Sequence, residues 1–138
     1  MEKEPATRKK QHKIKKAMKV STGHLSRPYL SIVVTTRNDN HGGDLNKRTQ
    51  LFIEGLNEQT LKYKLPVELI VVEWNPPSTT PPLSKQFIWP QHKYIHTRII
   101  TVGPELHRQF AYADSLPLFQ MIAKNVGVRR ARGEFILT

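Results

Sequence analysis

Two polar segments that carry ligand-binding groups each follow an apolar run of the chain. The second of them begins with Glu73, directly after residues 67–72. The first follows residues 30–34 and contains Thr35, Thr36, Arg37 and Asp39. A carboxylate in such a place can accept hydrogen bonds from ribose hydroxyls or from a base N–H. The alternative, that Asp39 and Glu73 cap loops and face water, is equally consistent with the sequence.

The apolar runs predict the frame that would position these groups. Residues 30–36 and 67–72 are rich in β-branched residues and almost continuously apolar, which is typical of parallel strands buried on both faces. Apolar residues at helical spacing predict a helix over 45–59, with Asp44 as its N-cap. The order strand, helix, strand implies a right-handed parallel crossover.

The second half of the chain continues the alternation. After a long segment without clear periodicity, residues 98–102 predict a third strand. Asp114 and Ser115 predict the start of a helix with Pro117 in its first turn and Gly133 as its stop. Residues 135–138 predict the beginning of a fourth, buried strand. The fold class is therefore α/β, an open and mostly parallel sheet with flanking helices, in which ligands bind outside the carboxyl ends of the strands.

Positive charge is concentrated at the start of the chain. Residues 1–27 hold nine Lys or Arg and two Glu, with few apolar groups, and this composition predicts a disordered basic arm before a folded part at 28–138. Lysine-rich segments bind nucleic acid or anionic surfaces, so an alternative function is a non-catalytic basic protein that binds nucleic acid through this arm. The lack of cysteine and of any membrane-length apolar run leads us to expect a cytoplasmic protein without a transmembrane segment.

Several other polar groups admit two interpretations. Asp39, His41 and Asp44 could hold a metal ion, although the polarity of a loop explains them as well. His107 lacks partners at ligand spacing, so we expect it on the surface. The chain has neither a glycine-rich dinucleotide fingerprint nor a P-loop.

Three arginines follow one another closely near the end of the predicted second helix. These are Arg129, Arg130 and Arg132. They either meet a diphosphate, for which the guanidinium fork is well suited, or form a solvated helix end.

Three blocks of the chain together resemble the family-two glycosyltransferases. They are residues 29–39 (YLSIVVTTRND), 68–75 (ELIVVEWN) and 123–137 (AKNVGVRRARGEFIL). The third block is the most specific, because its Asn, its Gly, the Ala-Arg-Gly-Glu run and an apolar strand occur together and in order. The resemblance covers about residues 29–138 and implies the Rossmann-like GT-A fold.

The resemblance also implies a binding site for a nucleotide sugar, a UDP-sugar above all. Thr35, Thr36, Arg37 and Asp39 match the family's nucleotide-contacting segment. Glu73 falls where the family has an Asp that reads the base or ribose, and Asn125 matches the Asn of the helix before the metal motif. The chain departs from the family in having Glu-Trp-Asn-Pro after the second strand, which makes Trp74 a candidate for stacking on a base, and in having Arg37 where an aromatic residue is common.

In the family, an Asp-x-Asp motif that binds Mg²⁺ or Mn²⁺ would begin directly after the strand at residues 135–138. Such a metal neutralises the leaving diphosphate during glycosyl transfer to an acceptor. We therefore expect an incomplete GT-A-type domain, the sugar-nucleotide-binding portion of a glycosyltransferase-like protein. No residue of this chain is assigned a catalytic or metal-binding role, and whether the chain is an enzyme stays open.

Overall fold

The structure, a computed structural model, describes residues 27–138 and contains a four-stranded sheet in which all strands are parallel. The strands are β1 (Leu30–Thr36), β2 (Val67–Trp74), β3 (Ile95–Val102) and β4 (Phe135–Leu137). They lie in the order β3-β2-β1-β4. This confirms the predicted α/β class. The predicted basic arm, except for Arg27, lies outside the described residues.

Because the strands are parallel, the sheet has two chemically distinct ends. We call the residues that lead into the strands (27–29, 62–66, 92–94 and 129–134) the amino edge. Those that leave β1, β2 and β3 (37–44, 75–82 and 103–119) form the carboxyl edge. The chain adds β2 and β3 on one side of β1 and then returns to place β4 on the other side. The strand order therefore switches at β1.

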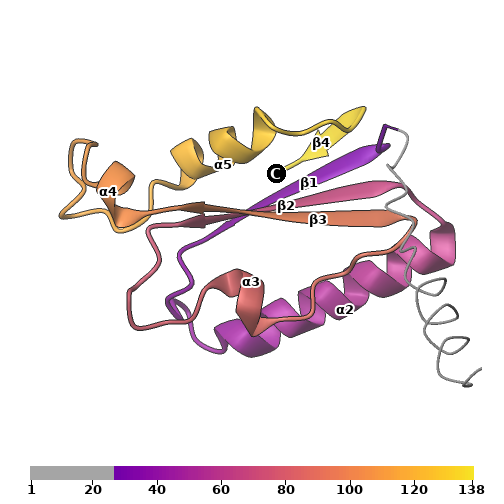
Figure 1. Ribbon diagram of the computed structural model, residues 1–138, viewed down its shortest axis with the longest axis horizontal. Helices are drawn as coiled ribbons and strands as arrows, with labels where there is room; N and C mark the ends of the chain where they lie inside the picture. The colour runs from indigo at the N-terminus through magenta and orange to yellow at the C-terminus, as the bar shows by residue number, and fades with distance from the viewer. Residues whose placement is uncertain (1–26) are drawn as a thin grey trace, which may run out of the picture.

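Helices cover both faces of the sheet (Figure 1). On one face lie α2 (Leu45–Tyr63) and α3 (Leu83–Gln86), which pack over a cluster that contains Leu69 and Val71. On the other lies α5 (Gln120–Val128), over a cluster that contains Ile70 and Val72. The short α4 (Pro104–His107) lies at the carboxyl edge. Every residue of β2 is buried, which explains why its sequence is apolar without alternation except for one glutamate near each end.

Glycines let the α5 layer approach β1 closely. A Cβ at Gly127 would collide with the side chain of Val33, so only glycine lets α5 lie directly on the strand. Gly133 was predicted as the helix stop, but α5 already ends at Val128. A Cβ at Gly133 would lie 2.5 Å from the backbone nitrogen of Ser31, so this glycine instead permits close contact between the α5–β4 connection and β1.

The predicted start of the second helix is wrong. Residues 111–115 form turns, and α5 begins only at Gln120. The Asn75 side-chain amide donates a hydrogen bond to the Pro117 carbonyl at 3.0 Å, and Phe119 packs into the core. These tertiary contacts hold the segment in a non-helical conformation, although the local sequence favours a helix.

Asp44 does precede α2, as predicted, but its side chain makes no capping hydrogen bond. The backbone N–H of Leu45 instead donates to Oδ1 of Asn40 at 2.9 Å. A side chain four residues before Asp44 thus takes over the predicted capping role.

The fourth strand exists as predicted, but the expectation that it is buried is wrong. Its three residues, Phe135 to Leu137, pair only with Leu30, Ser31 and Ile32 of β1, and all three are exposed. None of the three side chains belongs to the clusters that the helices cover on the two faces of the sheet. Between residues 27 and 138, no helix combines the length and apolar character needed to cross a bilayer.

Candidate functional site

A cavity of about 520 Å³ opens at the carboxyl edge, beside the end of β1. Its wall is built from the end of β1 and the following loop, the first turns of α2, the residues around the start of α5, and two side chains of the β2–β3 connection. This is the point where the strand order switches, at which open parallel sheets bind their ligands. The volume falls within the range of small-molecule and cofactor sites.

Four of the six side chains predicted to contact a nucleotide line this cavity together: Thr35, Thr36, Arg37 and Asp39. The other two are placed elsewhere. Glu73 is completely buried behind the wall, and Asn125 is exposed on α5 and is not among the lining residues. A nucleotide contact by any of the six stays a prediction.

Arg37 and Asp39, which both line the cavity, form an ion pair. Nη1 of Arg37 lies 2.9 Å from Oδ2 of Asp39, and Nε of Arg37 donates to the Asn75 carbonyl at 3.1 Å. Partial burial raises the pKa of Asp39, but hydrogen bonds from Arg37 and from the His41 N–H, with the charge of Arg37, outweigh it. The net result is a pKa below the ordinary value, so Asp39 carries its charge at neutral pH.

A second guanidinium reaches the cavity from α2. Nη2 of Arg48 donates to the His41 carbonyl at 2.9 Å. The loop that presents this carbonyl turns through Gly42 and Gly43, whose φ angles are +80° and +76°. No carboxylate of the described residues pairs with Arg48. Its remaining donors are therefore available to an anion in the cavity.

Two aromatic side chains form part of the cavity wall, which we call the aromatic wall. Phe52 and Trp89 both line the cavity. Trp89 is fixed in place because its Nε1 donates to the Leu83 carbonyl at 3.2 Å and its ring packs edge-on against Phe87. The cavity thus combines an apolar surface with a few charged groups, which is typical of ligand sites.

Arg48, Phe52 and Trp89 were missed by the reasoning from sequence. Arg48 had a usable signal, because the first turn of a helix that follows β1 must lie at the carboxyl edge. Phe52 lies one turn further along the same helix. Trp89 had no such signal, since it lies in a long segment without periodicity.

Glu73 supports the cavity from behind. Its carboxylate accepts hydrogen bonds from Nδ2 of Asn38 at 2.8 Å, the backbone N–H of Leu83 at 2.9 Å and the Thr101 hydroxyl at 2.9 Å. These donors come from the loop after β1, from α3 and from β3. A ligand could reach Glu73 only if this arrangement opened.

The prediction that Trp74 could stack on a base is wrong. Trp74 is 1% exposed, and its ring packs among Phe110 and Phe119. Its Nε1 donates to Nδ1 of His107 at 2.8 Å, while Nε2 of His107 lies 3.1 Å from the Ala113 carbonyl, which fixes the tautomer with hydrogen on Nε2. His107 is therefore buried, contrary to the expected surface position, because it satisfies the indole N–H.

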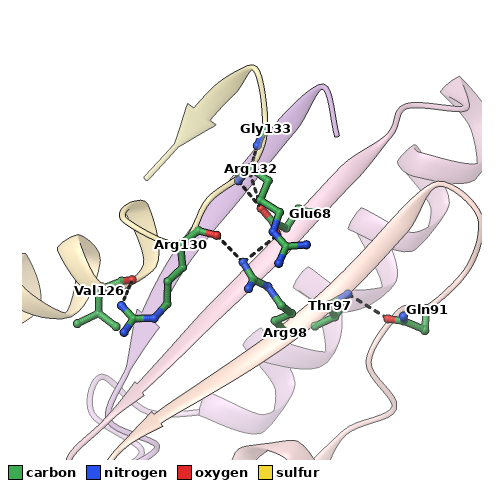
Figure 2. A network of polar contacts seen from close by, with 9 residues as sticks. Glu68, Gln91, Thr97, Arg98, Val126, Arg130, Arg132 and Gly133 are labelled. Carbon is green, nitrogen blue, oxygen red and sulfur yellow. Dashed lines mark hydrogen bonds and ion pairs between the residues drawn. The ribbon is translucent and has the colours of Figure 1, made fainter. Parts of the chain in front are cut away.

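The arginine cluster lies at the amino edge, at the opposite end of the sheet from the cavity. Figure 2 shows the Arg130 carbonyl bonded to Arg98 and the Arg132 backbone N–H bonded to Glu68, at the start of β2. The side chains of Arg129, Arg130 and Arg132 are exposed. The three arginines therefore do not line the cavity, and their exposure agrees with a solvated helix end, while contact with a diphosphate stays a prediction.

Metal-binding groups do not gather around the cavity. Within residues 27–138, no three His, Cys, Asp or Glu side chains are close enough to hold a metal ion. Asp39, His41 and Asp44 thus form no ligand set. The Mg²⁺ or Mn²⁺ site that the resemblance implies would follow the strand at residues 135–138, so this metal stays a prediction.

Comparison with known proteins does not extend the resemblance seen in the sequence. No protein-family model matches the chain, and neither a curated protein nor a solved structure matches it at a significant level. What the structure shows is a Rossmann-like, all-parallel α/β sheet with flanking helices and a cavity where the strand order switches.

Proposed function

We propose that the cavity binds the nucleoside diphosphate part of a nucleotide sugar, a UDP-sugar by the sequence resemblance. The chain would then be the donor-binding portion of a glycosyltransferase-like protein. The observation that carries the proposal is the combination of two guanidiniums, a carboxylate and an aromatic wall in one cavity at the switch point.

Each group has a distinct task in this proposal. Arg48 contacts the diphosphate, because a guanidinium offers donors in the geometry of phosphate oxygens. Asp39 already accepts bonds from Arg37 and His41, and its remaining lone pairs accept from a ribose hydroxyl or a base N–H. Trp89 provides the apolar surface against which the base lies.

The proposal is limited to binding. No described residue is assigned as a catalytic base, and no step is routed through a metal, because residues 27–138 bring no metal-ligand set together. Transfer of the sugar to an acceptor would need groups beyond those described. Calorimetric titrations with UDP should therefore be run both with and without Mg²⁺.

The decisive comparison is between two neighbouring cations on α2. Arg48→Gln removes a guanidinium that lines the cavity, whereas Lys47→Gln removes the same charge from a residue that does not line it. Loss of a charge-assisted hydrogen bond should weaken UDP binding by roughly ten-fold in Arg48→Gln and hardly at all in Lys47→Gln. Equal affinities of the two variants, or no UDP binding by the unmodified chain, would overturn the proposal.

Tryptophan fluorescence gives an independent test. The chain has two tryptophans, of which Trp74 is buried away from the cavity and Trp89 lines it. UDP should quench the emission of the unmodified protein, and Trp89→Phe should abolish the quenching. Quenching that survives in Trp89→Phe would place the ligand elsewhere.

A further inference from the structure

We propose that the amino edge of the sheet docks on anionic phospholipid membranes, with the cavity at the far end facing away from the bilayer. This inference does not depend on what the cavity binds. It begins with the distribution of charge between the two ends of the sheet.

The amino edge is strongly cationic. Every strand is preceded by at least one exposed Lys or Arg, and Glu134 is the one acidic residue in these segments. The seven cations are Arg27, Lys62, Lys64, Lys93, Arg129, Arg130 and Arg132. Because parallel strands begin at the same end of a sheet, segments far apart in sequence contribute to one surface (Figure 1).

The carboxyl edge has no such excess of positive charge. Together with the first turn of α2, its segments contain the four cations Arg37, Lys47, Arg48 and Arg108 against the four acids Asp39, Asp44, Glu105 and Asp114. The two ion pairs found among residues 27–138 join Arg37 to Asp39 and Arg98 to Glu68, so none of the seven amino-edge cations is paired with a described carboxylate. The asymmetry is therefore not cancelled locally, and it would orient the molecule toward an anionic surface.

Apolar and aromatic side chains lie among these cations. Tyr29 and Phe135 are about half exposed, with ring centroids 5.1 Å apart, and Tyr63 is 67% exposed with Lys62 over its ring. Leu61, in the last turn of α2, is also exposed. Cations beside tyrosines and aliphatic groups are typical of surfaces that lie in the membrane interface. A nucleic acid would use the cations, but it offers little to Leu61, so we favour a membrane.

The basic N-terminal segment joins this same edge. The chain enters the described part at Arg27, and Pro28 and Tyr29 accept backbone hydrogen bonds from Glu134 and Phe135 at 3.1 and 3.0 Å. The lysine-rich sequence before Arg27 is therefore attached beside the arginines that precede β4.

The test is flotation of the full chain with vesicles of phosphatidylcholine, with and without phosphatidylserine. The variant Lys62→Gln/Arg129→Gln/Arg132→Gln removes three cations from the amino edge. The matched control Lys47→Gln/Lys85→Gln/Arg108→Gln removes three exposed cations from other parts of the surface. Each cation near an anionic bilayer strengthens binding about five-fold, so the first variant should bind roughly a hundred-fold more weakly and the control almost normally.

Two outcomes would overturn the proposal. Equal losses in the two triple variants would show that total charge, and not the amino edge, determines binding. Binding to a mixed-sequence RNA oligonucleotide without binding to phosphatidylserine vesicles would identify nucleic acid as the partner. Thermal unfolding midpoints of both variants guard against loss of folding, and weaker binding at high salt is expected if headgroup charge is recognised.

Discussion

The strand β2 carries a buried glutamate near each end, and the two are held in different ways. Glu68, at the amino end, is 3% exposed and pairs with a cation, since Nη2 of Arg98 lies 2.8 Å from its Oε1. It also accepts a bond from the Ser31 hydroxyl. Figure 2 shows a further bond, from the Arg132 backbone N–H. Glu73, at the carboxyl end, is held by neutral donors only.

The two glutamates therefore have different roles: Glu68 holds strands together, and Glu73 supports the cavity. Glu68 joins β1, β2, β3 and the connection that leads into β4, far from the cavity. Glu73 joins the loop after β1 to α3 and β3, directly behind the cavity. Substitutions at the two positions should therefore affect stability and ligand binding in different proportions.

The largest effect is expected at Glu68. Glu68→Gln removes the negative partner of Arg98 and turns an amide N–H₂ toward its guanidinium or toward the donors Ser31 and Arg132. Breaking a fully buried pair costs roughly 3–5 kcal/mol, but Arg98 is partly exposed, so we expect a loss of about 2 kcal/mol in the free energy of unfolding. Urea denaturation measures this directly, and a loss no larger than that of Glu73→Gln would contradict the comparison.

A smaller loss of stability is expected at Glu73. In Glu73→Gln, the amide oxygen can still accept from Asn38 and Leu83, and the Thr101 hydroxyl can rotate to accept from the new N–H₂. With no cation left unpaired, the free energy of unfolding should fall by about 1 kcal/mol. A loss above that of Glu68→Gln in the same urea series would show that Glu73 has a charged role that its neighbours do not reveal.

Ligand affinity should rank the two variants in the reverse order. This prediction rests on the proposed binding of UDP in the cavity. In Glu73→Gln, the neutral amide oxygen is a weaker acceptor than the carboxylate and holds the backbone of Leu83, a lining residue, less firmly. UDP binding should therefore weaken by less than about ten-fold, whereas Glu68→Gln should leave the affinity unchanged where both variants are folded. Calorimetry on both proteins at a low, fixed temperature tests this. A selective loss in Glu68→Gln would mean that the two ends of the sheet are coupled.

The strands of the sheet can be predicted from the sequence far better than the segments that cover the cavity. The bounds of β1 match the prediction because a continuous β-branched run permits little besides a central strand. The predicted start of α5 is wrong because Asn75, more than forty positions away, holds Pro117 in a non-helical segment. Contacts of this kind are set by the fold and leave no local pattern.

Some residues of the candidate site could likewise be predicted from the sequence, and others could not. Thr35 to Asp39 were predictable because the end of β1 must lie at the switch point. Glu73 points to the same face of the sheet as Val71, which lines the cavity, but α3 covers Glu73. This helix lies in the segment without periodicity, so its covering role, like the position of Trp89, could not be predicted.

The two ends of the sheet should also respond to acid in different ranges of pH. At the amino edge, burial lowers the pKa of His92 from its ordinary value of 6.5. The unfolded chain therefore binds the proton more readily, and the stability from neutral His92 is complete above pH 6.5 and lost as pH falls through the lower folded value. We expect His92→Gln to flatten the slope of unfolding free energy against pH below pH 6.5. An unchanged slope would show that another group titrates in this range.

At the carboxyl edge, the free energy of unfolding also falls with falling pH, but in a lower range of pH. The pKa of Asp39 lies below its ordinary value of 3.8, since Arg37 outweighs the opposing effect of burial. The stability from the ionised pair is therefore complete above the unfolded value and lost as pH falls through the folded one. Both side chains are about a quarter exposed, so solvent screening limits the contribution to about 0.5 kcal/mol. Asp39→Asn should flatten the unfolding free energy below pH 4 while leaving the His92 range intact. If Asp39→Asn changes the slope near pH 6 instead, the assignment of the two acid responses to the two ends of the sheet is wrong.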